Sequence, residues 1–444
     1  MRHLSTLLWA LLLLAVPRVA AQIEPHTPSS VALASPDNIS HALLTPRSAL
    51  PLYPSREQMD AAAASDFIIP LESWQVDSLP EGTRYTARFK RNYRFDDKEM
   101  VLRVEGATGA ISVAVNDVEV GYTSAGRGRS EFDLTKKLKE NHNTIAITVH
   151  RNYAAQALEG PSTTPLTFRK AALLTPPRVA VADYVVATKF NKQGDGLLNL
   201  GVVMQSFLLN SKDYTVYYEL YSPEGKLLTS ANKVVTTAML SRDTVNFFTR
   251  VPAAKRWSPE EPNLYRLVVY TRHENRIKEF TTKQIGFRTA EADESGLVLN
   301  GTPIDIKATT IHPEQAEPTE SELNKLRKEG YNLVFTPRPA SDEFYSLCDK
   351  VGMLVCTSAD ITTPDLDISS SPSNNPLWRE SYIWRAQMAY HTTKLHPSVV
   401  MFAIGHNAQN GICLYESYLA MKAIEGETRP IVYPDAAGEW NTDL

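Results

Sequence analysis

The sequence predicts a multidomain protein of the β plus α/β class, with two β-sandwiches followed by a partial (β/α) barrel. Residues 83–149 form short runs of alternating polar and apolar residues separated by Gly, Asn and Asp, a pattern typical of an all-β sandwich. Residues 177–292 repeat the pattern with longer runs. After residue 300, short apolar runs alternate with amphipathic helical segments, which indicates parallel β/α units.

The first residues have the pattern of an export signal. Arg2 and His3 precede an apolar run at 7–16, and small residues follow at 19–21, so we assign 1–21 to a signal peptide. Residues 22–60, rich in Pro, Ser and Ala, are expected to form an extended lead-in. We expect an exported protein in the periplasm or on the surface of a bacterium, without a transmembrane segment in the mature chain because later apolar runs are too short.

Composition excludes several classes of function. The net charge of -4 provides no basic field for nucleic acid, which we do not expect as a partner. The three cysteines, Cys348, Cys356 and Cys413, have neither disulfide-scaffold nor zinc spacing, and we expect buried apolar thiols, with one disulfide left open. Arg127 and Arg129 lie in a glycine-containing stretch without phosphate-loop spacing. We expect these arginines to make a polar contact on the sandwich rim. We expect no cofactor.

The first sandwich is assigned to residues 61–176 and the second, of immunoglobulin-like type, to 177–292, with a break at Thr175–Pro177 between them. Residues 293–444 contain the barrel units. The expected elements are strands at 304–311, 332–336, 353–359, 398–405 and 430–435, and helices at 320–330, 342–352, 377–395 and 414–426.

The five expected strands fall short of a closed barrel. Eight units need about 250 residues, whereas 144 residues follow Asn300. We therefore expect a partial barrel. Its outer edge is covered by a helix, by the other domains or by a partner chain, or the sequence is a fragment.

Five segments, in order, resemble glycoside hydrolase family two, the β-galactosidase and β-glucuronidase group, from about Pro51 onward. They are "VAVNDVEVGY" with the following "SEFDLT", "WSPEEPNLYRLVV", "IGFRTAEADESGLVLNGTPIDIKA", "LHPSVVMFAIG" and "ETRPIVY". The resemblance implies that residues 61–176 form a jelly-roll sugar-binding-like domain, and that residues 293–444 form part of a TIM barrel.

The same resemblance implies that the chain lacks the family's acid/base glutamate. Such enzymes use two glutamates about 5 Å apart, and the acid/base closes the fourth strand in G-N-E. The aligned residues are Gly405, His406 and Asn407, and a carboxamide has no acidic proton to give at any useful pH. The nucleophile belongs to a later strand, so no residue is assigned to it. We expect no catalytic residue, with Asp435 and His406 as weak candidates.

Other segments of the implied pocket are altered too. The family motif R-G-x-N-x-H aligns with residues 307–312, and of these only His312 matches the motif. In the motif V-R-x-S-H-Y-P, this chain has Phe335 at the position of the arginine. The family's magnesium ligands fall on Thr362 and Pro364, so we expect no metal. The L-E-D-Q-D loop retains Leu158 and Glu159 and has Gly160, Pro161 and Ser162 in the remaining positions. The substrate-binding candidates are His312, Arg338, His406 and Asn407.

Three functional hypotheses follow. The first is an exported, catalytically inactive β-galactosidase-like protein that acts as a glycan-binding or protein-binding component of the cell envelope. The second is an active glycoside hydrolase whose carboxylates are relocated or supplied by a partner. The third is an envelope subunit without sugar affinity. The expected partners are a glycan, or an exported or outer-membrane protein that covers the half-barrel edge.

Overall fold

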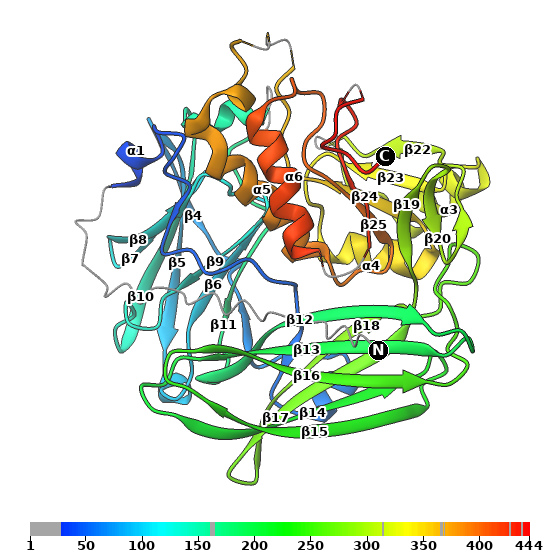
Figure 1. Ribbon diagram of the computed structural model, residues 1–444. Helices are drawn as coiled ribbons and strands as arrows, with labels where there is room; N and C mark the ends of the chain where they lie inside the picture. The colour runs from blue at the N-terminus through cyan, green and yellow to red at the C-terminus, as the bar shows by residue number, and fades with distance from the viewer. Residues whose placement is uncertain are drawn as a thin grey trace, which may run out of the picture.

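The computed structural model describes residues 28–159, 165–312, 315–364, 367, 369–425, 428–436 and 438–444. The expected signal peptide at 1–21 lies outside the described residues. Figure 1 shows a first sandwich in blue and cyan, a second in green, and a yellow-to-red α/β unit that contacts both. The predicted fold class, multidomain β plus α/β, is confirmed.

The first sandwich packs two antiparallel sheets over one apolar core. Strand β10 (Asn141–His150) buries Ile145, Ile147 and Val149 at every second position, as a half-buried strand requires. The larger sheet has the order β1 (Ser40–His41), β8 (Val118–Thr123), β7 (Ile111–Val115), β10 (Asn141–His150), β5 (Gly82–Arg91) and β4 (Gln75–Leu79). The smaller sheet has the order β3 (Ile68–Pro70), β11 (Lys170–Leu174), β6 (Val101–Glu105) and β9 (Arg129–Asp133).

The lead-in is bonded to both sandwiches. It contains α1 (Ser29–Ala32), β1, β2 (Leu52–Tyr53) and α2 (Arg56–Asp60). Strand β1 joins the larger sheet of the first sandwich, and β2 pairs with β18 (Arg276–Ile285) of the second sandwich. The guanidinium of Arg56 lies 2.8 Å from a carboxylate oxygen of Glu219. This segment therefore ties the two sandwiches together.

The second sandwich has three strands facing five. The three-stranded sheet has the order β12 (Val179–Phe190), β13 (Gly196–Ser206) and β16 (Arg242–Val251). The other has the order β15 (Leu227–Thr237), β14 (Lys212–Tyr221), β17 (Tyr265–His273), β18 (Arg276–Ile285) and β2. A small sheet of β19 (Ala290–Asp293), β20 (Gly296–Leu299) and β21 (Thr302–Pro303) leads into the α/β unit.

The α/β unit has five parallel strands in chain order. They are β22 (Ala308–Thr310), β23 (Leu333–Thr336), β24 (Leu354–Ser358), β25 (Val399–Ala403) and β26 (Ile431–Val432). The connecting helices are α3 (Glu320–Lys328), α4 (Asp342–Val351), α5 (Arg379–Thr393) and α6 (Ile412–Ile424). The strand predicted at 304–311 is shorter than expected. Its first residue, Ile304, is bonded to Leu297 of β20 instead, and β22 is an exposed edge strand.

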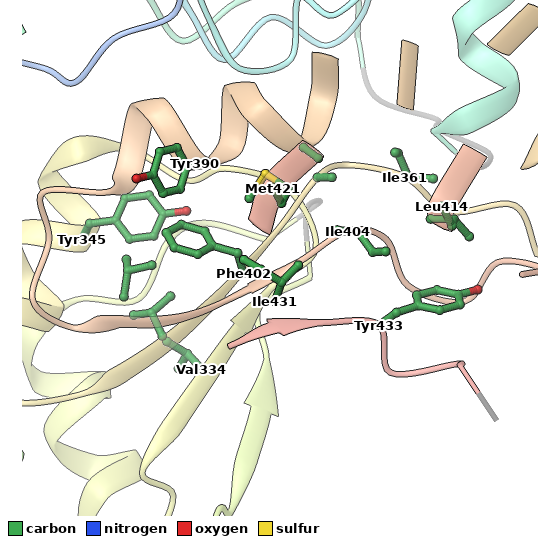
Figure 2. Packing of buried hydrophobic residues seen from close by; sticks show 14 of the residues in the cluster. Val334, Tyr345, Ile361, Tyr390, Phe402, Ile404, Leu414, Met421, Ile431 and Tyr433 are labelled. Atoms are coloured by element: carbon green, nitrogen blue, oxygen red, sulfur yellow. The ribbon is translucent and has the colours of Figure 1, made fainter. Parts of the chain in front are cut away.

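The core of this unit lies between the sheet and its helices. Figure 2 shows Phe402 and Ile431 from adjacent strands close to Tyr390 of α5 and Tyr345 of α4. The three cysteines are buried and free of disulfides, as predicted for small apolar residues. Among the helices of the described residues, none has both the length and the apolarity needed to cross a bilayer.

The outer edge of β26 is bonded to residues of the chain itself. The amide of Ile431 donates to Asp443 Oδ2 at 2.8 Å, and the amide of Asp443 donates to the Ile431 carbonyl at 2.9 Å. The amide of Tyr433 donates to Thr442 Oγ1 at 3.2 Å. These are the backbone groups that face away from β25, so Thr442 and Asp443 occupy the bonding positions of a further strand.

A buried charged cluster joins the second sandwich to the α/β unit. His396 Nδ1 lies 2.6 Å from Asp349 Oδ2, and its Nε2 lies 3.1 Å from both Asp342 Oδ1 and Lys283 Nζ. Asp349 also accepts from Ser398. Burial alone lowers the pKa of His396, and Lys283 acts in the same direction, but Asp349 and Asp342 outweigh both and raise it.

Candidate functional site

A cavity of about 330 Å³ lies between the first sandwich and the carboxyl ends of β22 and β23. The loops after parallel strands are the usual position of ligand sites in barrels. The first sandwich contributes Gly106, Ala107, Arg127 and Arg169, and the α/β unit contributes Ile311, His312, Gln315, Ala316, Glu317 and residues 336–340.

Two of the four predicted substrate-binding residues line this cavity. His312 is exposed after β22, and Arg338 is half-buried after β23. His406 and Asn407 follow β25 and are not among the lining residues. The structure therefore separates the predicted set into a pair on the cavity wall and a pair farther along the strand ends.

His406 packs edge-on against Phe335, with the ring centroids 5.4 Å apart. Burial lowers the pKa of the imidazole, although the carboxylate of Asp435 acts in the opposite direction. The ring is therefore neutral at pH 7. Phe335 stands where the resemblance implies an arginine, and it offers His406 an apolar face instead of a charge.

Asn407 is exposed and adopts a left-handed backbone conformation, with φ 46°. Its carbonyl accepts from the Thr363 amide at 3.1 Å and from the Thr362 hydroxyl at 3.3 Å. Asparagine is one of the few residues that tolerate this conformation. The other weak catalytic candidate, Asp435, is exposed after β26. Neither Asn407 nor His406 is a proton donor at neutral pH, and Asp435 is the one carboxyl group among the three.

A buried network joins the first sandwich to the α/β unit, and sequence reasoning missed it. Arg385 of α5 lies 2.5 Å from Glu159 Oε1 and 3.4 Å from Asp360 Oδ2. Arg127 lies 3.2 Å from Glu159 Oε2 and 3.0 Å from Asp360 Oδ2, and the hydroxyl of Tyr153 donates to Glu159. Arg127 makes polar contacts, as expected, but its side chain is 7% exposed and lies inside this network instead of on an open rim.

The electrostatics of the network are balanced, with two arginines against two carboxylates. Burial alone raises the pKa of Glu159, but Arg385 and Arg127 outweigh it and lower the pKa. Burial raises the pKa of Asp360, and the neighbouring Glu159 raises it further. Arg127 and Arg385 lower it, but they do not reverse the shift. The backbone adds a contact at the same place, where the Thr362 amide donates to the Leu158 carbonyl at 2.8 Å. Glu159 therefore helps to hold the first sandwich and the α/β unit together.

The remaining acidic groups of interest have structural partners. Burial alone raises the pKa of Glu131, but Arg47 and Arg103 lower it to about 2. Glu317, the single carboxylate among the described lining residues of the cavity, accepts from the Ser341 amide at 2.7 Å and pairs with Arg169 at 3.2 Å. Within the described part of the chain, no group of three or more His, Cys, Asp or Glu residues is placed to hold a metal ion.

Two family profiles match the chain. That of "Glycosyl hydrolases family 2" covers residues 179–288, and that of "Glycosyl hydrolases family 2, TIM barrel domain" covers residues 315–443. The chain is a glycosyl hydrolase family 2-like protein. The matched ranges fall on the second sandwich and on the α/β unit, in the order that the sequence motifs predicted.

Several β-galactosidases are similar to this family 2-like chain. That of Priestia megaterium is 25% identical over 372 residues, which are 79% of this chain and 36% of the relative. That of Vibrio vulnificus is 28% identical over 348 residues, which are 74% and 33% of the two chains. The chain thus spans about a third of the length of these curated relatives.

Solved structures show the same fold at low identity. A Bacteroides uniformis β-glucuronidase 2, solved covalently bound to cyclophellitol-6-carboxylate aziridine, has a TM-score of 0.69 at 17% identity, over 89% of this chain and 52% of its own. A putative β-galactosidase of Bacteroides fragilis has a TM-score of 0.70 at 15% identity, over 91% and 66%. Both likenesses concern the fold alone.

Proposed function

We propose that this family 2-like protein is an exported, non-hydrolytic, glycan-binding component of the bacterial cell envelope. The proposal rests on Asn407, which follows β25 and which the motif resemblance aligns with the family's acid/base glutamate. General acid catalysis needs a group that can donate a proton to the leaving oxygen, and a carboxamide has none to give at neutral pH.

The neighbours of Asn407 do not replace the missing acid. The neutral imidazole of His406 donates no proton at pH 7, because burial lowers its pKa. Asp435 is exposed after β26, and it is not among the residues that line the cavity. A family 2 hydrolysis also needs two carboxyl groups about 5 Å apart, and the cavity has Glu317 alone among its described lining residues.

The cavity supports binding in place of hydrolysis. Arg338 and the ion-paired Arg169 and Glu317 bring N–H groups and carboxylate oxygens to the wall, and the ring of His312 is exposed on the same wall. Sugar hydroxyls need such a mixture of donors and acceptors around a partly enclosed space. The β-galactosidases among its relatives make β-galactosides the first glycans to examine.

The test combines hydrolysis and binding on the full chain. We expect no release of nitrophenol from aryl β-galactosides or β-glucuronides, and binding of labelled protein on a glycan array that Arg338→Ala weakens about tenfold. Lys350→Ala, which removes an exposed ion pair with Glu320 on α3, is the matched control and leaves binding unchanged. Hydrolysis that survives Asn407→Ala and is abolished by Asp435→Ala would instead establish an active enzyme with a relocated carboxylate.

Export has a separate test. Expression in a bacterial host and mass spectrometry of the mature protein should give an N-terminus near Gln22. Intact protein that begins at Met1 and stays in the cytoplasm would contradict the proposed location without affecting the proposed binding.

A further inference from the structure

We infer that Tyr415 and Trp440 form a second carbohydrate site, which takes a neutral pyranose chain by stacking. We call the two rings the aromatic platform. They lie on α6 and in the loop after β26, on segments that follow the last two strands of the sheet. The platform is distinct from the cavity, which is lined by loops after the first two strands, and the inference does not depend on binding there.

Trp440 is the exposed ring of the platform, and Tyr415 is half-buried. Trp440 leaves 57% of its surface in solvent, which is unusual for so large an apolar group. Its indole stacks on the Tyr415 ring with centroids 4.7 Å apart and planes 22° apart. Tyr418 meets the indole edge-on, with centroids 6.0 Å apart and planes 79° apart. The two tyrosines therefore hold the indole in one orientation.

Hydrogen bonds fix the groups beneath the platform. The Tyr415 hydroxyl donates to Glu439 Oε2 at 2.9 Å, and the Tyr418 hydroxyl donates to Asp443 Oδ1 at 2.6 Å. The buried side chain of Asn441, next to Trp440, exchanges two hydrogen bonds with Asn410, at 3.0 and 3.2 Å. A ring that is already held in place loses little conformational freedom on binding, so stacking on it costs less entropy.

The chemistry around the platform selects a neutral sugar. One face of a pyranose ring presents C–H groups, which pack on the negative face of an aromatic ring, while its hydroxyls seek polar partners at the edge. The exposed polar neighbour of the platform is the carboxylate of Glu439, which accepts hydroxyl hydrogens and repels carboxylates or sulfates. The nearby Lys422 is paired with Asp443 at 3.0 Å.

The apolar surface continues along α6, where Ile412 is 47% exposed and Leu419 is 55% exposed. A protein partner is therefore the rival occupant, for which the obvious form is a second copy of this chain. The edge of β26 is already bonded by Thr442 and Asp443, so strand addition does not explain the patch. The polar edge and the fixed orientation of the stacked rings favour the sugar.

The test is a calorimetric titration of the full chain with cellotetraose, β-1,4-galactotetraose and trigalacturonate. We expect one of the neutral tetrasaccharides to bind, Trp440→Ala to weaken its binding about tenfold, and Trp440→Phe, which keeps a ring, to weaken it about threefold. Tyr93→Ala is the matched control because Tyr93 is 88% exposed on the first sandwich, away from the platform. It leaves binding unchanged.

Four results would overturn the inference. They are the absence of binding by either neutral tetrasaccharide, equal affinity of Trp440→Ala and the wild type, tighter binding of trigalacturonate than of the neutral sugars, and a dimer in sedimentation that Trp440→Ala dissociates. Loss of tetrasaccharide binding in Arg338→Ala, with Trp440→Ala unaffected, would place all binding in the cavity and leave the proposed function standing.

Discussion

The buried network between the first sandwich and the α/β unit yields a sharp prediction. Glu159→Gln removes one of the two carboxylates that balance Arg127 and Arg385, while the amide keeps the shape of the side chain. The Glu159 side chain is 2% exposed and that of Arg385 is 3% exposed. Breaking a buried ion pair from one side costs about 3–5 kcal/mol, because the remaining charge stays buried without compensation.

The expected change in melting temperature follows from this cost. The first sandwich and the α/β unit together have about 270 residues, which gives an unfolding entropy of about 0.6 kcal/mol/K. If the two unfold together, the melting temperature of Glu159→Gln falls by about 5–8 °C in scanning calorimetry. Lys350→Ala, which removes the exposed pair with Glu320, changes the melting temperature by about 1 °C or less.

A double variant separates the charge effect from lost packing. Glu159→Gln combined with Arg385→Gln restores the balance of one arginine and one carboxylate, so the two destabilisations should fall short of additivity by about 1–3 kcal/mol. The reasoning is refuted if Glu159→Gln has the same melting temperature as Lys350→Ala. It is also refuted if the destabilisations of Glu159→Gln and Arg385→Gln are additive in the double variant.

Three further predictions concern stability. Folding raises the pKa of His396 above 6.5. Its contribution to the free energy of unfolding is therefore present below pH 6.5 and is lost as the pH rises through the raised pKa. The urea midpoint of the wild type should fall between pH 6 and 8, and that of His396→Gln should fall less steeply. Glu279 is fully buried and burial raises its pKa to about 8, so stability should fall from pH 4.5 to 8. Glu279→Gln should add about 1–3 kcal/mol at pH 9 by urea titration, and an unchanged midpoint would contradict the assigned cause. Gly352 has φ 74°, and an added Cβ would lie 2.3 Å from the Pro259 carbonyl oxygen; Gly352→Ala should therefore lower the calorimetric melting temperature, by at least the equivalent of about 1 kcal/mol.

The order of the domains and the β/α units could be predicted from the sequence because periodicity is a local signal. Helix α4, for example, begins after Ser341, whose hydroxyl accepts from the Phe344 amide, and ends at Gly352 in the left-handed conformation. Such caps and apolar periods lie within a dozen residues, so each can be recognised without knowledge of the rest of the chain.

The network and the edge of β26 could not be predicted because their partners are distant in the sequence. Glu159 and Arg385 are 226 positions apart, and no local pattern marks them as partners. Arg127 looked like a rim residue because it follows a glycine turn, yet the α/β unit covers it. His312 and Arg338 line the cavity and His406 does not, because the first sandwich covers the carboxyl ends of only some of the strands. That arrangement is set by tertiary packing, which a local sequence pattern does not reveal.

The hydrogen bonds of Thr442 and Asp443 to β26 bear on the tendency of the protein to aggregate. An unpaired parallel edge offers a template on which exposed strands of other molecules can add, and this is a common route to aggregation. The Asp443 carboxylate accepts from the Ile431 amide and is paired with Lys422 at 3.0 Å, so a side chain held in place occupies the position where such a strand would bond. Thr442 and Asp443 thus occupy the positions at which such a strand would bond, and their removal would leave the outward-facing backbone groups of Ile431 and Tyr433 without these partners.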